Sequence, residues 1–370
     1  MIGKIPLMKP YLTDEVKQKV LEVLDSGMWT EGSVTEELEN QFRSYLGCKH
    51  ALAVTSCTTG LELALRALKL GPGDEVIVPD YTYPATADVV DIVGANTVII
   101  DIDPKTMNMD YDKLEAAITS RTKAILPVSL FGNPLDYEKL GRIRKHYGIP
   151  IVEDAACAIG AEHGGIKVGT FADITVFSFH PRKFITTGEG GMVTTDNSKW
   201  ADWMNSYKHF GMEKTETRLT TDFRRIGTNY KLSNLLAAVG VVQMRHVEEL
   251  LVHRRAQAKI YHDLLEGNAK VTLPETTAGG IHSYQSFCVF VENRDFVLNS
   301  MRAKGIEVQI GTYALHMHQA FSENPRCKVD GEMEGSRFAF AHCLALPLFH
   351  TLTEAQQERV VRELEEVLTA

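Results

Sequence analysis

The sequence predicts an α/β fold, in which a large domain with a mostly parallel sheet precedes a smaller C-terminal α+β domain. From residue 51 to about 195, short runs rich in β-branched residues alternate with stretches of helical length, as in a sheet covered on both faces. The runs span residues 75–78, 97–100, 124–126, 151–152 and 174–177. At roughly 150 residues per domain, the 370 residues suffice for two domains.

Two amphipathic helices are expected before the first strand. In residues 13–27 apolar side chains recur on one helical face, with Thr13 as the N-cap and Gly27 as the stop. Residues 35–47 repeat the pattern. The apolar faces consist of Val16, Val20, Val23 and Leu24 in the first helix and of Leu38, Phe42, Tyr45 and Leu46 in the second.

The second half of the chain is predicted to begin with a long helical segment over residues 232–266. A strand at 287–291, a helix at 294–304 and a last helix with capping-box spacing between Thr353 and Gln356 follow. We expect a large domain over 1–250 and a small domain over 251–370. No flexible linker marks this boundary.

Composition excludes several classes of protein. The 39 Lys and Arg against 48 Asp and Glu give a net charge of −9, so no general field attracts nucleic acid or an anionic membrane. The longest apolar run, 235–242, is far shorter than the ~20 residues of a membrane span, and the N-terminus lacks the apolar run of a signal peptide. We therefore expect a cytoplasmic protein that binds neither nucleic acid nor membranes.

Metal sites and several common catalytic motifs are not indicated. The six cysteines form no C-x-x-C pair, which argues against structural zinc and a disulfide framework. His316 and His318 form the tightest histidine pair, and we interpret them as ordinary loop residues rather than metal ligands. The sequence lacks G-x-x-x-x-G-K-[ST], G-x-G-x-x-G after a strand, H-E-x-x-H and G-x-S-x-G.

The densest chemical signal follows the run 174–177. Residues 177–183 read F-S-F-H-P-R-K, and residues 186–191 read T-T-G-E-G-G, which permits a close approach of the backbone. A lysine at the end of a buried strand is a candidate for Schiff-base formation, because desolvation favours the neutral amine. Most lysines in loops are merely solvated, so Lys183 alone does not establish Schiff-base chemistry.

Three further elements point to the same kind of site. Asp154 lies at the carboxyl end of the strand predicted from the run at 151–152, where it either caps a helix or pairs with a pyridinium nitrogen. The S-C-T-T-G turn at 56–60 offers hydroxyls and a helix N-terminus to a phosphate, although N-capping alone would explain one of them. Tyr83 either stacks on a planar cofactor or lies in the core.

Together these segments resemble the DegT/DnrJ/EryC1/StrS family of pyridoxal phosphate-dependent sugar aminotransferases. The resemblance rests on the lysine motif, V-E-D-A-A at 152–156, the S-x-T-T turn and G-D-E-V-I-V-P at 73–79. It continues through G-T-N-Y-K-L-S at 227–233 to L-P-L at 346–348, and so covers nearly the whole chain. It implies a fold type I transferase that binds pyridoxal 5'-phosphate (PLP) and its amino form, pyridoxamine 5'-phosphate (PMP).

The resemblance also implies a role for matching residues. Lys183 would hold PLP covalently and then shuttle a proton between the amino-bearing carbon and the cofactor. Asp154 would pair with the pyridine nitrogen, and Tyr83 would stack on the ring. Asn229 would reach the phosphate of the neighbouring subunit, so that a homodimer would build composite active sites.

The resemblance also implies which residues bind the phosphate, and the sequence differs from the family pattern at three positions. Ser178, Thr58 and the backbone N–H of Cys57 would bind the phosphate. Cys57 replaces the usual Gly, Cys157 replaces Gln, Glu or His in D-A-A-x-A, and Ser129 replaces a frequent His. Cys157 is still expected to touch the cofactor, although ring and substrate contacts there and at Ser129 are in doubt.

The predicted reaction is a ping-pong transamination. The amino group would pass from L-glutamate to the cofactor and then to a nucleotide-linked keto sugar. Lys183 favours this outcome, because relatives that remove a sugar hydroxyl typically carry His at this position. F-S-F-H-P-R-K and G-E-G-G-M favour a perosamine synthase-like subfamily that acts on a 4-keto-6-deoxy sugar.

The sequence is also consistent with other acceptors and with a non-catalytic role. The acceptor could be a keto-inositol or a non-nucleotide keto sugar, or the protein could be a non-catalytic regulator that only holds PLP. We expect residues 28–33, 210–225 and 313–321 to select the substrate.

Overall fold

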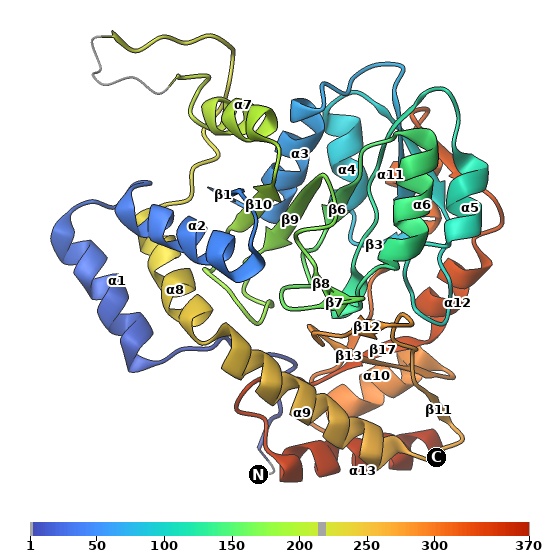
Figure 1. Cartoon of the computed structure of the whole chain (residues 1–370). Coiled ribbons are helices and arrows are strands. Elements are labelled where there is room, and N and C mark those ends of the chain that lie inside the picture. The colour runs from blue at the N-terminus through green and yellow to red at the C-terminus, as the bar shows by residue number, and fades with distance from the viewer. Residues whose placement is uncertain (1–2, 214–219, 370) are drawn as a thin grey trace.

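The molecule is organised around one twisted sheet (Figure 1). The structure is a computed structural model that describes residues 3–213 and 220–369. Two four-stranded sheets, β16-β4-β2-β5 and β6-β9-β10-β1, are joined by the isolated parallel bridges Ile125↔Ile151 and Val128↔Asp154. Among these strands only β10 runs antiparallel to its neighbours, so the predicted mostly parallel sheet is confirmed.

Each of the five predicted runs overlaps a strand of this sheet. The strands are β1 (His50–Val54), β2 (Glu75–Pro79), β4 (Asn96–Ile100), β5 (Thr122–Ile125), β6 (Val152–Asp154), β9 (Ile174–Ser178), β10 (Gly191–Thr195) and β16 (Cys327–Asp330). Except in the edge strand β16, their side chains are almost all buried, which explains why the sequence shows apolar runs here rather than alternation.

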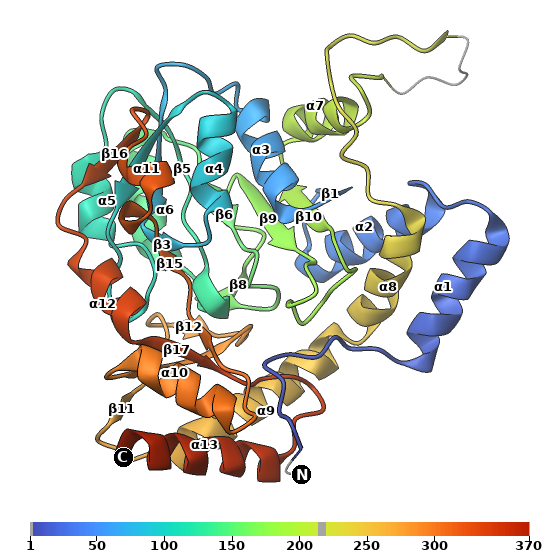
Figure 2. The same cartoon turned by 180° about the vertical axis from the view of Figure 1, so that it is seen from behind.

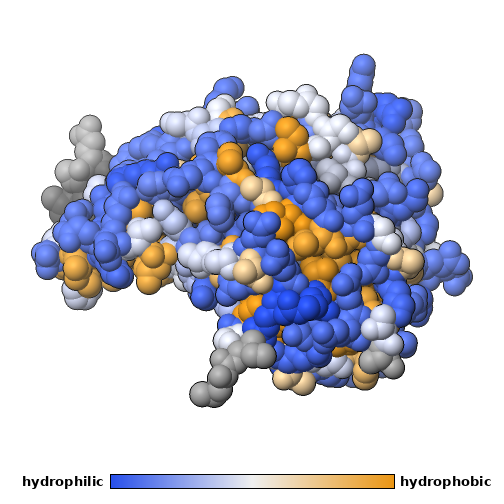
Figure 3. Space-filling model, turned by 90° about the horizontal axis from the view of Figure 1, so that it is seen from below, coloured by the Kyte–Doolittle hydropathy of each residue, from blue (hydrophilic) through white to orange (hydrophobic). Residues whose placement is uncertain are grey.

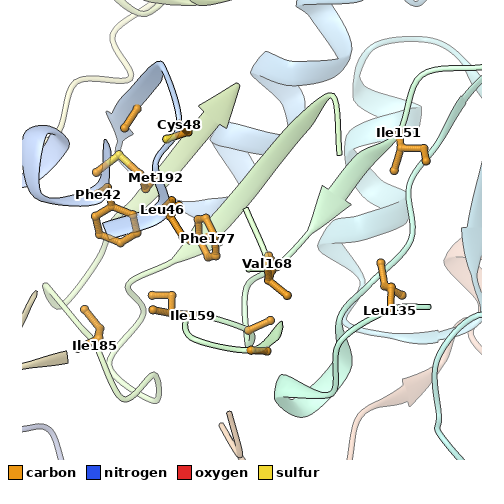
Figure 4. Close-up of a cluster of buried hydrophobic side chains, with 14 of the residues drawn as sticks. Phe42, Leu46, Cys48, Leu135, Ile151, Ile159, Val168, Phe177, Ile185 and Met192 are labelled. Carbon is orange, nitrogen blue, oxygen red and sulfur yellow. The ribbon is translucent and has the colours of Figure 1, made fainter. Parts of the chain in front are cut away.

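Helices cover the sheet on both faces. One buried cluster packs helices α2 (Ser33–Leu46), α5 (Tyr111–Ala117), α6 (Tyr137–Tyr147) and α8 (Asn234–Arg245) on the sheet, and Figure 4 shows part of it around Phe42, Phe177 and Met192. A second cluster packs α3 (Cys57–Ala67), α4 (Ala85–Ile92), α7 (Ser198–Lys208) and α11 (Gln319–Ser322) on the opposite face, which is turned to the viewer in Figure 2. Side chains alternate between the faces, as Ile77 and Val78 do.

The N-terminal helix α1 (Asp14–Ser26) has the predicted caps but only part of the predicted burial. Thr13 caps its start, and Gly27 ends it in the left-handed conformation at φ 68°. Val16 and Val23 are buried against α8, whereas Leu24, which we expected on the buried face, is 41% exposed. The reason is that α1 lies at the edge of the molecule, so its apolar face exceeds the surface that α8 covers (Figure 1).

The predicted helix over 232–266 is two helices. Helix α8 ends at Arg245, and α9 (Val247–Leu265) begins after His246, whose ψ of 10° interrupts the helical path. The break lets α8 pack on α1 and α2, while α9 continues to the C-terminal region (Figure 1). The predicted boundary at residue 250 falls inside α9, and the division into 1–250 and 251–370 remains a prediction.

The C-terminal region has a four-stranded antiparallel sheet of its own. The order is β11 (Val271–Thr272), β13 (Phe287–Val291), β17 (Cys343–Leu346) and β14 (Gln309–Ile310), and the helices here are α10 (Arg294–Ala303), α12 (Glu334–His342) and α13 (Glu354–Thr369). The predicted capping box is confirmed, because Gln356 N–H donates to Thr353 Oγ1 and Thr353 N–H donates to Gln356 Oε1. Ile5 joins this core through a bridge to Ile306.

Small elements connect these layers. They are β3 (Tyr81–Thr82) paired with β15 (Tyr313–Ala314), the sheet of β12 (Gly280–Ile281), β7 (Glu162–His163) and β8 (Ile166–Lys167), and the 3₁₀ turns η1 (Leu130–Gly132) and η3 (Leu315–Met317). No helix in residues 3–213 and 220–369 is long and apolar enough to cross a membrane.

Candidate active site

Four predicted site residues meet where β6, β9 and the start of α3 come together. Lys183 lies in the loop between β9 and β10, and its Nζ lies 3.0 Å from Cys157 Sγ. Cys57 Sγ lies 3.9 Å from Asp154 Oδ1. We call Lys183, Asp154, Cys57 and Cys157 the lysine cluster. It combines an amine, a carboxylate and two thiols at the carboxyl edge of the sheet, where ligands of α/β proteins bind.

Asp154 is held as a buried hydrogen-bond acceptor. Thr86 Oγ1 donates to its Oδ2 at 2.8 Å, and the Ala156 N–H donates to its Oδ1 at 3.1 Å. Burial raises the pKa of Asp154, although these hydrogen bonds and the nearby Lys183 oppose the shift. A tight turn rather than a helix follows residue 154, so the helix-cap interpretation of Asp154 is wrong.

The charge state of Lys183 differs from the expectation based on burial alone. Burial lowers the pKa of the ammonium, but Cys157, Cys57 and Asp154 raise it, and the net direction is upward. Burial alone therefore does not set the pKa of Lys183, because its contact with Cys157 and the nearby Asp154 carboxylate oppose the effect of desolvation.

A C-terminal side chain fixes the backbone on both sides of Lys183. The Phe184 N–H donates to Gln285 Oε1 at 3.1 Å, and Gln285 Nε2 donates to the Arg182 carbonyl at 2.7 Å. Gln285 is buried and lies just before β13. Sequence reasoning missed this residue, because a single glutamine a hundred positions away carries no local signal.

The helix N-terminus that was predicted to bind phosphate lies beside the lysine cluster. Ser56 caps α3 and forms a reciprocal capping box with Thr59. Two of the hydroxyls are thus used for capping, whereas Cys57 and Thr58 begin the helix, where backbone N–H groups have no partner within the helix. The half-buried Thr58 is free of the capping box and remains available to a ligand.

A glycine lets the strands approach this helix end closely. Gly191 pairs with Ser178 on one side and with Val54 on the other. A Cβ atom at Gly191 would lie 2.8 Å from the Cys57 backbone nitrogen, so any larger residue would displace the start of α3. Ser178 pairs with this glycine at the end of β9, and its predicted phosphate contact remains a prediction.

Ser129, one of the departures from the family pattern, does not face the lysine cluster. Its hydroxyl donates to Glu153 Oε1 at 2.5 Å, and Tyr137 donates to the same carboxyl group. Burial raises the pKa of Glu153 to about 7. Glu153 and Asp154 are consecutive strand residues, so their side chains point to opposite faces of the sheet.

Tyr83 and Asn229 lie outside the lysine cluster. Tyr83 is 65% exposed, and its ring centroid lies 6.2 Å from that of Tyr313. Asn229 is exposed beyond β1, and its Oδ1 accepts a hydrogen bond from Lys231 Nζ at 2.7 Å. Both side chains are accessible to a ligand or another chain, and their predicted contacts with the cofactor remain predictions.

Thr86 is a second residue that sequence reasoning missed. Its hydroxyl, which donates to Asp154, also lies 3.0 Å from the hydroxyl of Thr82. The spacing of four residues between Thr82 and Thr86 at the start of α4 was the available signal. This chain of hydroxyls ties the segment that carries Tyr83 to the buried carboxylate.

The segments expected to select the substrate are partly described. In the segment 313–321, Tyr313 and Ala314 pair with β3 next to Tyr83. Residues 28–33 contact the start of α8, where Asn234 Nδ2 donates to the Met28 carbonyl. Of the segment 210–225, residues 214–219 lie outside the described residues.

In the part of the chain that the structure describes, no group of three or more His, Cys, Asp or Glu side chains could hold a metal ion.

Comparisons with known proteins agree with this geometry. The model of the DegT/DnrJ/EryC1/StrS aminotransferase family matches residues 10–365. GDP-perosamine synthase from Caulobacter vibrioides is 37% identical, with 99% of each chain covered. A family aminotransferase from Brucella abortus is 31% identical at a TM-score of 0.90, with 96% of each chain covered.

A further solved structure is the PLP form of the sugar aminotransferase Spr1654 from Streptococcus pneumoniae, which is 29% identical at a TM-score of 0.91, with 99% of each chain covered. These likenesses extend over the sheet, the lysine loop and the C-terminal region, and confirm the predicted fold type I class. The chain belongs to the DegT/DnrJ/EryC1/StrS aminotransferase family.

Proposed function

We propose that this protein is a PLP-dependent aminotransferase that moves an amino group from L-glutamate to a nucleotide-linked 4-keto-6-deoxy sugar. The observation that carries the proposal is the lysine cluster, in which the amine of Lys183 and the buried carboxylate of Asp154 lie at one sheet edge beside a helix N-terminus. The acceptor class is supported by the likeness to GDP-perosamine synthase.

The residues present fit PLP. The helix N-terminus with Thr58, Ser178 and the Cys57 N–H suits a phosphate dianion, because the helix dipole and free N–H groups favour negative charge. The Asp154 carboxylate suits a protonated pyridine nitrogen, and the Lys183 amine suits the aldehyde. When bound, PLP supplies an electron sink for the carbon that loses its proton.

The side chains of this chain perform the remaining tasks. Asp154 would keep a proton on the pyridine nitrogen, and Thr86 with the Ala156 N–H holds that carboxylate in place. Lys183 Nζ would move the proton between the amino-bearing carbon and the cofactor. Gln285 fixes the backbone on both sides of Lys183, which would keep the amine in position for this proton transfer. Tyr83 would stack on the ring, and Cys157 would contact the cofactor.

A homodimer with composite sites is part of the proposal. Exposed apolar side chains gather on two parts of the surface, namely α1 with its flanking residues and the described residues between α7 and α8. They are Leu12, Leu21, Leu24, Met28 and Trp29 in the first part and Phe210, Met212, Phe223 and Ile226 in the second. Figure 3 shows apolar patches within the largely hydrophilic surface at the end of the molecule that α1 forms. A second copy would cover them and bring its Asn229 to the phosphate.

The acceptor is tested with the PLP-loaded protein, L-glutamate and a GDP-linked 4-keto-6-deoxy sugar. We expect 2-oxoglutarate and the amino sugar nucleotide to form in equal amounts, as mass spectrometry can show, and Lys183→Ala to abolish both. A keto-inositol and a keto sugar without nucleotide serve as competing acceptors. Preferential amination of either one would contradict the proposed acceptor while leaving the aminotransferase chemistry intact.

Asp154→Asn preserves size but removes the charge that keeps the pyridine nitrogen protonated. We expect the cofactor to remain bound and the half-reaction with glutamate to slow by about 10²–10³-fold, the scale of losing one electrostatic stabiliser. Stopped-flow absorbance measures this rate. The exposed Asp88 on α4 provides the control Asp88→Asn, which should react at the wild-type rate. A wild-type rate for Asp154→Asn would show that Asp154 has only a structural role.

Composite sites predict complementation between two inactive chains. Lys183→Ala and Asn229→Ala are each expected to be impaired as homodimers. A mixed dimer would hold one site with both defects and one site with neither, so activity should return toward half the wild-type value per mixed dimer. Mixing Lys183→Ala with Asp154→Asn is the control, because both residues serve the same chain's site and no intact site can form.

Subunit exchange is verified first, by native mass spectrometry of differently tagged chains. Recovery in the first mixture and none in the control supports a phosphate contact from the partner's Asn229. No recovery after verified exchange would show that Asn229 serves its own chain, and would remove the composite site from the proposal.

A further inference from the structure

The direct contact between the thiol of Cys157 and the amine of Lys183 has a chemical consequence beyond transamination. Cys157 lies in the turn after β6, three residues beyond Asp154, and its Sγ accepts a hydrogen bond from Lys183 Nζ at 3.0 Å. The Cys157 backbone is held as well, because its carbonyl accepts from Ser283 Oγ at 3.4 Å. The sulfur is thus presented to the amine by a turn that is itself anchored.

We propose that Cys157 is an oxidation site whose oxidised sulfur is captured by the Lys183 amine, forming a reversible sulfur–nitrogen bond that disables the lysine. The oxidant is a hydroperoxide, such as hydrogen peroxide. The structural basis is the pairing of a half-buried thiol with a half-buried amine at hydrogen-bond distance.

The surroundings favour Cys157 over the other thiols of the chain. The Cys157 sulfur lies 3.0 Å from the Lys183 amine, so its oxidised form would lie within reach of attack by that nitrogen. Burial and the Asp154 carboxylate raise the pKa of Cys57 well above its usual range, so that Cys57 stays a thiol. Cys48, Cys288 and Cys343 are buried in the apolar cores. Cys327 is half-buried at the edge strand β16, away from the lysine cluster.

The S–N bond forms in two steps, oxidation of the sulfur and attack by the amine. The Cys157 sulfur attacks one peroxide oxygen, the O–O bond breaks, and sulfenic acid and water form, so that sulfur is oxidised by two electrons and peroxide is reduced. The neutral Lys183 amine, after losing its ammonium proton to solvent, then attacks this sulfur. The S–O bond breaks, the hydroxide leaves with an amine proton as water, and an S–N bond remains. A thiol reductant cleaves that bond and restores both side chains.

The consequence for the cofactor rests on the proposed role of Lys183. An amine bonded to sulfur cannot bind the PLP aldehyde, so the oxidised apoprotein should not take up PLP covalently. Conversely, PLP already bound to the amine should prevent the S–N bond. Cofactor-free protein is therefore the form in which Cys157 and Lys183 react with each other.

The experiment compares apoprotein and PLP-loaded protein after treatment with hydrogen peroxide. We expect digestion without reductant to yield one peptide pair joined between Cys157 and Lys183, lighter by two hydrogen atoms than the separate peptides. The joined pair should be present in oxidised apoprotein, absent from PLP-loaded protein and lost after dithiothreitol. PLP uptake, followed by absorbance, should be lost on oxidation and return after dithiothreitol.

Matched variants separate this bond from other oxidation products. Cys157→Ser should give no joined peptide, and Cys57→Ser should still give it, with each variant compared with its own untreated sample. A Cys57–Cys157 disulfide, an irreversible acid at Cys157, or an unmodified Cys157 under conditions that oxidise Cys327 would each overturn the proposal. Because the joined peptide is detected without cofactor, these results do not depend on whether the proposed transamination is correct.

Discussion

The buried carboxylate of Asp154 is the constraint around which the site is arranged. A charged group at the end of a buried strand is costly unless hydrogen bonds and an opposite charge compensate. Thr86 and the Ala156 N–H supply the hydrogen bonds, and the Lys183 ammonium supplies the charge. Each of these partners comes from a different element, so the carboxylate can be tolerated only when α4, the turn after β6 and the lysine loop are all in place.

The same requirement links the large sheet to the C-terminal region. The loop that carries Lys183 joins β9 to β10, and side chains from outside the sheet hold its backbone. Gln285, which precedes β13, bonds the chain on both sides of Lys183, while Ser283 holds the turn of Cys157. The position of the reactive amine therefore depends on how the C-terminal region docks, which is one physical reason why both parts are needed for one site.

Local patterns in the sequence were sufficient for most of the fold. The apolar runs, Thr13 with Gly27, and the Thr353–Gln356 box act within a few residues, and the structure confirms them. The break at His246 and the exposure of Leu24 were not predictable, because each depends on what a helix packs against.

The residues of the site likewise divide into those that the local sequence indicates and those whose role depends on partners distant in the sequence. Lys183 and Asp154 follow strands of one parallel sheet, which placed both at its ligand-binding edge, and the structure brings Cys57 and Cys157 to the same place. Gln285 and Thr86 were missed, since their partners are distant in the sequence. The upward shift in the pKa of Lys183 was also missed, because the thiols and the carboxylate outweigh the burial that the sequence indicates.

Borohydride reduction shows directly whether Lys183 is the residue that holds PLP. The PLP-loaded protein is reduced with sodium borohydride, digested and analysed by mass spectrometry. We expect a stable pyridoxyl label on Lys183, retained in the control Lys231→Ala and absent from Lys183→Ala. A label on another lysine, or a protein that binds PLP without any reducible bond, would contradict it.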